Sequence, residues 1–100
     1  MKAYTVRLEA RAQHEVEEAR ARMGAGRGVV LDEELRAVQE RLSENPEIGP
    51  RARTRSGRHP TLRWLVLLRN PYLLYYLVNH ERELVVIVSL WHNRRRRPKA

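Results

Sequence analysis

The residues best suited to chemistry stand together near the C-terminus, where His92 is followed by Asn93 and by four consecutive arginines, 94–97. An imidazole exchanges protons near neutral pH, and guanidinium groups hold phosphate through paired hydrogen bonds. This cluster therefore predicts contact with a phosphate-bearing or acidic partner. A structural hydrogen bond that fixes the C-terminal turn is the other role open to His92.

Other reactive side chains are not spaced for catalysis or metal binding. The chain has no cysteine, and its four histidines lack the spacing of a zinc motif, so we expect neither a metal nor a cofactor. Asp32 is the only aspartate, and no serine lies in the sequence of an activated nucleophile. The run Gly24-Ala25-Gly26-Arg27-Gly28 joins two expected helices, so it predicts a flexible turn instead of a phosphate-binding loop.

Charge is distributed unevenly along the 100 residues. Residues 1–50 carry eight Lys+Arg and ten Asp+Glu, a net charge of −2, whereas residues 51–100 carry twelve and two, a net charge of +10. Such a single-sign half attracts phosphate or an acidic protein. No apolar run approaches the roughly 20 residues of a membrane span, and the lack of cysteine fits a reducing compartment. We therefore expect a cytoplasmic protein with no membrane partner.

The elements that must position these residues begin with a strand and two helices. Residues 3–8 alternate between apolar and polar types, which predicts a half-buried strand. A helical stripe then runs to Met23, where the glycines end the first helix, and a second stripe runs from Leu31 to Leu42. Asn45-Pro46 should stop the second helix. The two helices should form an antiparallel hairpin.

The C-terminal half predicts a sheet. Residues 47–61, broken by glycine and proline, should be irregular, and apolar strands should follow at 62–68, 72–78 and 84–91. Links this short join only antiparallel neighbours. Trp64 and Tyr76 are expected in the core, while Tyr75 and Trp91 suit an exposed face. The expected fold is a single α+β domain over residues 1–100: an N-terminal strand, a two-helix hairpin and a three-stranded antiparallel sheet, with a basic tail at 94–100.

These elements, in this order and with this spacing, resemble the RelE/ParE superfamily of bacterial toxins over roughly residues 3–98. The segments that carry the resemblance are Leu42-x3-Pro46-x2-Gly49, RNPYLLYYLV at 69–78 and LWHNRRRRP at 90–98. The last two look closer to ParE-like plasmid-stabilisation proteins. The resemblance implies the toxin of a type II toxin–antitoxin system, neutralised by a cognate acidic antitoxin.

Two activities are implied by the resemblance. ParE-like members poison DNA gyrase and are not nucleases, and this activity is the one we expect. RelE-like members cut mRNA on the ribosome, which is the alternative, and a generic nucleic-acid-binding module is a third possibility. A second acid–base group beside His92 is not evident apart from a tyrosine, and this shortage favours binding over catalysis.

The resemblance and the residue types together give two sets of expected site residues. The residues expected to bind the target or nucleic acid are Arg69, His92, Arg94, Arg95, Arg96 and Arg97. The residues expected to act if the chain is an endoribonuclease are His92, Arg94, Tyr76 and Arg63.

Overall fold

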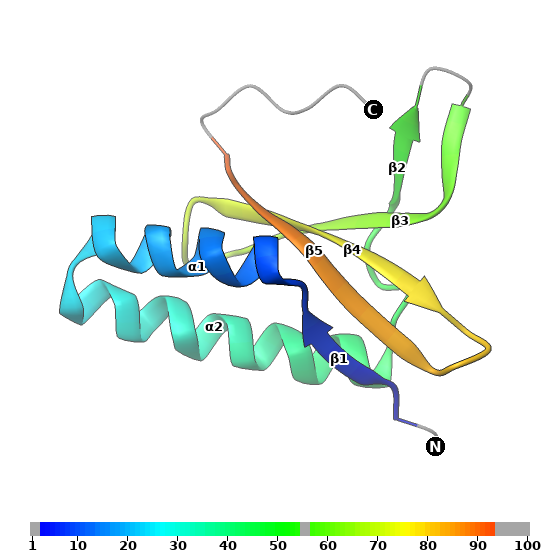
Figure 1. The fold of residues 1–100 in the computed structure, drawn as a ribbon, viewed down its shortest axis with the longest axis horizontal. Coiled ribbons are helices and arrows are strands. Elements are labelled where there is room, and N and C mark those ends of the chain that lie inside the picture. The colour runs from blue at the N-terminus through cyan, green and yellow to red at the C-terminus, as the bar shows by residue number, and fades with distance from the viewer. Residues whose placement is uncertain (1–2, 55–56, 94–100) are drawn as a thin grey trace.

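Two helices and five strands make up the described part of the chain, residues 3–54 and 57–93, in the computed structural model (Figure 1). In chain order they are β1 (Thr5–Leu8), α1 (Ala10–Met23), α2 (Ala25–Glu44), β2 (Arg51–Thr54), β3 (Gly57–Val66), β4 (Tyr72–Asn79) and β5 (Leu84–His92). The expected α+β class and the order strand, helical hairpin, sheet are confirmed. The chain has one strand more than predicted, β2, and all five strands join one sheet, whereas the sequence predicted a three-stranded sheet after the helices.

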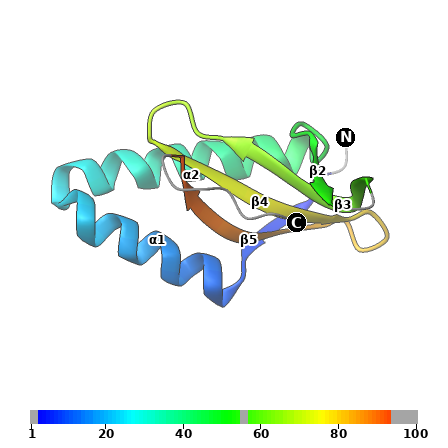
Figure 2. The ribbon, with the colours of Figure 1, turned by 90° about the horizontal axis from the view of Figure 1, so that it is seen from above.

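The helices lie side by side because each carries one apolar stripe (Figures 1 and 2). The buried side chains that make up this seam are Ala12, Ala19, Leu31, Leu35, Val38 and Leu42. Both predicted stripes are therefore confirmed. Helix α2 ends at Glu44, directly before the extended Asn45 that precedes Pro46, as the steric restriction before proline requires.

The link between the helices is shorter than predicted. Gly24 alone forms it, with φ at +83°, a conformation that side chains with a Cβ rarely adopt. Helix α2 already begins at Ala25, so Gly26 and Gly28 lie inside the helix and the prediction of a five-residue turn was wrong. Gly28 is buried, and a Cβ at this position would lie 3.8 Å from the side chain of Arg20, an ordinary contact distance.

The strands form one mixed sheet in the order β1-β5-β4-β3-β2. Strand β1 is parallel to β5, and the other neighbours are antiparallel, as the short links predicted. Strand β1 pairs only with residues 84–87 of β5. Beyond them, a side chain of α1 accepts a hydrogen bond from the same edge of β5. There the N–H of Leu90 donates to Oε1 of Glu15 at 3.1 Å.

The segment 47–61 is not irregular throughout. Residues 51–54 form β2 at the edge of the sheet, and β3 begins at Gly57 instead of residue 62. Arg51 and Arg53 are exposed and Ala52 is buried, which is the alternation of a strand with one face in water. The prediction missed this strand because the glycines and prolines at its borders indicate irregular structure. Edge strands tolerate such residues.

The helices cover one face of the sheet. The core joins the helical stripes to Leu67, in the turn after β3, and to one face of β4 and β5. The strand residues on this face alternate, except where the register of β5 shifts between Ile87 and Leu90, and they are Tyr72, Leu74, Tyr76, Val78, Val85, Ile87 and Leu90. The residues between them project from the opposite face. The structure is therefore a two-layer α+β arrangement in which one sheet face has no helix over it.

Candidate functional site

His92 is the last residue of β5 and faces the helical side of the sheet. It is paired with Tyr72, and the two rings meet edge to face at 5.1 Å between centroids. The hydroxyl of Tyr72 in turn accepts a hydrogen bond from Arg22 of α1 at 3.5 Å, which raises the pKa of Arg22. Directly after His92, the N–H of Asn93 donates to the carbonyl of Pro71 at 2.8 Å. His92 is thus half-buried in a fixed corner between β4, β5 and α1.

Four of the expected target-binding arginines, Arg94 to Arg97, lie outside the described residues. Arg94 is also one of the four residues expected to act in a nuclease. Their role stays a prediction from the sequence.

Tyr76 lies in the core, as the sequence predicted, with no exposed surface. Its hydroxyl accepts a hydrogen bond from the N–H of Gly49 at 2.9 Å. Burial is the main cause that raises the pKa of Tyr76, and the Gly49 hydrogen bond opposes this shift. The phenol is therefore neutral at physiological pH, and in this structure it cannot touch a substrate.

Arg63 is held by the loop that follows α2. Its Nη1 donates to the carbonyl oxygen of Gly49 at 2.7 Å, and its Nη2 lies 3.1 Å from Oε2 of Glu47. The side chain is only 13% exposed. Arg63 thereby stabilises the same loop whose Gly49 contacts Tyr76, and its hydrogen-bonding capacity is directed at the protein.

The structure does not bring the described nuclease candidates together. His92 is paired with Tyr72 and Arg63 with Tyr76, four positions apart along β4, or about 13 Å at about 3.3 Å per residue. General acid–base catalysis needs its groups within hydrogen-bond reach of one substrate. A contribution of Tyr76 and Arg63 to a site at His92 would require them to leave their present partners.

Arg69 lies in the turn between β3 and β4, at the end of β4 where His92 also lies. Its guanidinium approaches Oε2 of Glu33 at 3.7 Å, and both side chains are 55% exposed. Its backbone N–H donates to the carboxylate of Glu34 at 2.9 Å. Sequence reasoning missed Glu34, although its spacing of three from Leu31 and four from Val38 places it on the buried stripe.

The helix-free face of the sheet is apolar and aromatic, and we call it the open face. Its residues face one another through the strand registers, and they are Leu62, Trp64, Val66, Leu73, Tyr75, Leu77, Val86 and Trp91. Leu73 is fully buried among its neighbours, and Val66 is exposed. Trp64, Tyr75 and Trp91 are all half-buried, so the open face carries the two predicted exposed aromatics and also Trp64, which was expected in the core.

A second polar cluster lies at the opposite end of β4. Nδ1 of His80 is 2.7 Å from the hydroxyl of Tyr4, and Nε2 of His80 is 3.7 Å from Glu47. The same Glu47 contacts Arg63, so this cluster joins β1, the loop after α2 and the β4–β5 turn. Its hydrogen bonds connect parts of the fold to one another.

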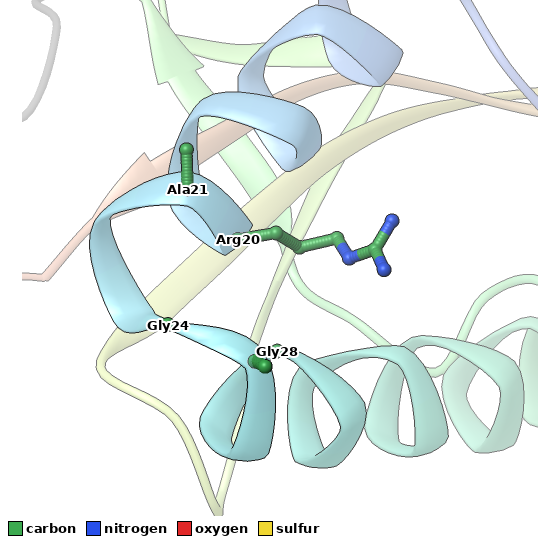
Figure 3. A pocket seen from close by; sticks show the side chains of 5 residues that line it. Arg20, Ala21, Gly24 and Gly28 are labelled. Carbon is green, nitrogen blue, oxygen red and sulfur yellow. The ribbon is translucent and has the colours of Figure 1, made fainter.

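A shallow hollow of about 360 Å³ lies where α1 turns into α2 (Figure 3). Its lining residues are Arg20, Ala21, Gly24, Ala25 and Gly28. The guanidinium of Arg20 pairs with Asp32 at 3.3 Å, and the other four residues have no polar side chain. The hollow therefore offers little chemistry for a ligand.

Among residues 3–54 and 57–93, no three histidine or carboxylate side chains lie close enough to hold a metal ion. In the same part of the chain, no helix is both long enough and apolar enough to cross a membrane.

Comparison with solved structures identifies relatives of this fold. The toxin–antitoxin complex RelBE2 from Mycobacterium tuberculosis matches with 24% identity and a TM-score of 0.66, covering 92% of this chain and 93% of that chain. The isolated RelE toxin of E. coli matches with 23% identity and a TM-score of 0.63, covering 94% and 88%. The chromosomal ParDE system of P. aeruginosa matches with 13% identity and a TM-score of 0.63, covering 90% of this chain and 96% of that chain.

The sequence itself indicates the family. A search of curated proteins gives no match. Residues 6–97 match the family described as the ParE toxin of the type II toxin–antitoxin system parDE, and this match spans every described strand and helix except the first residue of β1. The chain therefore belongs to the ParE toxin family of type II toxin–antitoxin systems.

Proposed function

We propose that this chain acts as a gyrase-directed toxin that binds its target without cutting nucleic acid. The observation that carries the proposal is that two candidate catalytic side chains, Tyr76 and Arg63, make hydrogen bonds within the protein and lie away from His92. The hydroxyl of Tyr76 is buried on Gly49, and the guanidinium of Arg63 is held by Gly49 and Glu47, a few strand positions away from His92. Membership of the ParE family favours the same choice.

We further propose that an acidic antitoxin neutralises the toxin in the cytoplasm. The open face supports this proposal because it presents half-buried apolar side chains with no helix over them. The exposed Arg51 and Arg53 on the edge strand and the net charge of +10 in residues 51–100 favour an acidic partner. An antitoxin segment with apolar and acidic residues would match both properties.

The experiment that tests the activity compares His92→Ala with the wild-type protein in two assays, gyrase supercoiling and ribosome-dependent mRNA cleavage. For a gyrase poison, His92 contributes a contact or a structural hydrogen bond worth about 0.5–1.5 kcal/mol, a loss of about tenfold or less. For a nuclease, removing an acid–base group costs about 10²–10⁴ in rate. We expect both proteins to inhibit gyrase, and we expect His92→Ala to lose about tenfold or less of the wild-type potency.

A matched control is His14→Ala, which removes an exposed imidazole from α1, where its Nε2 lies 3.6 Å from Oε1 of Glu18. Circular dichroism and thermal melting must first show that both variants fold. Wild-type cleavage of mRNA that collapses about a thousandfold in His92→Ala, with gyrase unaffected by either protein, would replace the gyrase proposal with the endoribonuclease.

A further inference from the structure

Leu68, in the turn between β3 and β4, is the most exposed large hydrophobic residue among the described residues. It is 87% exposed, against 55% for Val29 and 36% for Val66. Single exposed leucines are common on protein surfaces and need no explanation. Leu68 is different because the backbone that carries it is held in place by a buried charge.

That charge is the carboxylate of Glu34 on α2, whose residue is 8% exposed. Its Oε2 accepts the N–H groups of Leu68 at 2.8 Å and Arg69 at 2.9 Å, and its Oε1 accepts Nδ2 of Asn70 at 2.7 Å. Burying a carboxylate costs several kcal/mol unless hydrogen bonds compensate. All three compensating bonds go to the turn, two to backbone N–H groups and one to the side chain of Asn70, so α2 holds the turn in place.

The fixed turn displays a cation next to the leucine. The exposed Arg69 pairs with the equally exposed Glu33 at 3.7 Å. An exposed pair at this separation is worth at most about 1 kcal/mol, so Arg69 can exchange Glu33 for a carboxylate of a partner. Leu68 and Arg69 thus form a two-residue anchor, one apolar and one cationic, on a rigid support. Figure 2 shows this turn projecting from the sheet beside α2.

We propose that the anchor inserts into a folded protein that offers an apolar pocket with a carboxylate at its rim. This proposal rests on the proposed function, and the partner is accordingly the target of the toxin. A side chain that is 87% exposed in a turn protrudes from the protein surface, and a concave, preformed surface buries such a side chain most completely. An extended antitoxin segment would instead cover the open face. Glu34 is the positioning residue, because a prearranged anchor loses less entropy on binding.

The test measures the toxin level per cell that halves the growth rate, with toxin quantified by immunoblot, and the affinity for the cognate antitoxin. Leu68→Ser should require at least about tenfold more toxin, as expected when a buried anchor is truncated. Leu68→Met keeps the apolar bulk and should stay close to wild type. Arg69→Gln should weaken toxicity, whereas Arg82→Gln, in the turn at the other end of β4, is the matched control and should not.

The affinity for the antitoxin shows why toxicity is lost. A variant that fails only in target binding keeps this affinity, whereas a misfolded variant, or one altered in an interface that target and antitoxin share, loses it. We expect Leu68→Ser to keep the melting temperature and the antitoxin affinity of the wild type. Undiminished toxicity of Leu68→Ser would refute the anchor. Antitoxin binding weakened as much as toxicity would also refute it, since the anchor would then serve the antitoxin. A wild-type protein without toxicity would leave the anchor no target and refute it too.

The gyrase assay decides the proposed function independently of the anchor. A toxic protein that leaves gyrase unaffected would end the gyrase proposal, while the growth measurements still decide the anchor. Glu34→Gln adds a readout specific to positioning. Hydrogen exchange should accelerate at the amides of Leu68 and Arg69, and the toxin level for half-growth should rise as these amides lose protection. Faster exchange with unchanged toxicity would show that Glu34 has only a structural role.

Discussion

At the scale of single residues, the hydroxyl of Tyr76 is the polar group on which the loop after α2 depends. Tyr76→Phe keeps the ring but leaves the buried N–H of Gly49 without its acceptor. An unsatisfied buried donor costs about 1–3 kcal/mol. We expect urea denaturation at neutral pH to show a loss of this size. The control is Tyr75→Phe, because Tyr75 precedes Tyr76 on β4 but lies on the open face. This change should alter the free energy of unfolding by less than about 0.5 kcal/mol.

The same tyrosine predicts a pH dependence. Burial raises the pKa of Tyr76 above its ordinary value of 10.0. The unfolded chain therefore releases the phenolic proton at a lower pH than the folded chain does. Below pH 10 the contribution to stability is complete, and it is lost as the pH rises through the folded-state pKa. The free energy of unfolding should fall more steeply above pH 10 in the wild type than in Tyr76→Phe; equal slopes would contradict the assignment.

The sequence singled out some candidate site residues and missed another for a physical reason. His92 and Arg69 were singled out because each lies beside polar residues at the end of an apolar strand, and their role in target binding stays a prediction. Glu34 was not predicted because a charged residue at a buried position of a helix contradicts the apolar pattern unless its hydrogen-bond partners are known. Those partners are backbone N–H groups of residues 68 and 69, which no side-chain pattern reveals.

At the scale of elements, α1, α2, β4 and the body of β5 were predictable because burial of one face imposes a period on their sequences. Strand β2 and the start of β3 were not, because they pair at the edge of the sheet through backbone groups, which leave no pattern of side-chain types in the sequence. The start of α2 was missed because glycine disfavours helices locally. Gly26 and Gly28 nevertheless lie inside the helix, and Gly28 is buried.

Two glycines of opposite roles give a prediction at this scale. A Cβ at Gly49 would collide with the backbone oxygen of Trp64 and lie 2.9 Å from the hydroxyl of Tyr76. Gly49→Ala should therefore destabilise the fold by about 1–3 kcal/mol, the usual cost of overpacking. Gly26→Ala should stabilise it by up to about 1 kcal/mol, because Gly26 lies within α2 and nothing lies within 4 Å of its Cβ position. Thermal melting of both variants measures the contrast, and equal shifts would argue against it.

At the scale of the whole molecule, charge and layering act together. The helical hairpin supplies most of the acidic residues and one covering layer. Residues 51–100 carry the net charge of +10, and strands β3, β4 and β5 within them form the open face. The acidic half of the sequence thus lies mainly in the helical layer, and the basic half supplies the open face. The sequence predicted the charge separation, but the register was needed to place the aromatics on one face.

This separation predicts how the toxin meets its antitoxin. Long-range attraction speeds the encounter, whereas the apolar contacts of the open face set how long the complex lasts. Raising the ionic strength from about 0.05 M to about 0.5 M should slow association by about tenfold and change dissociation by less than about threefold. Stopped-flow mixing with the cognate antitoxin measures both rates. Replacing the exposed Arg51 and Arg53 with glutamine should flatten the salt dependence, whereas Arg36→Gln on α2, in the acidic half, should not. Association that is equally fast at both salt concentrations would show that charge does not guide the encounter.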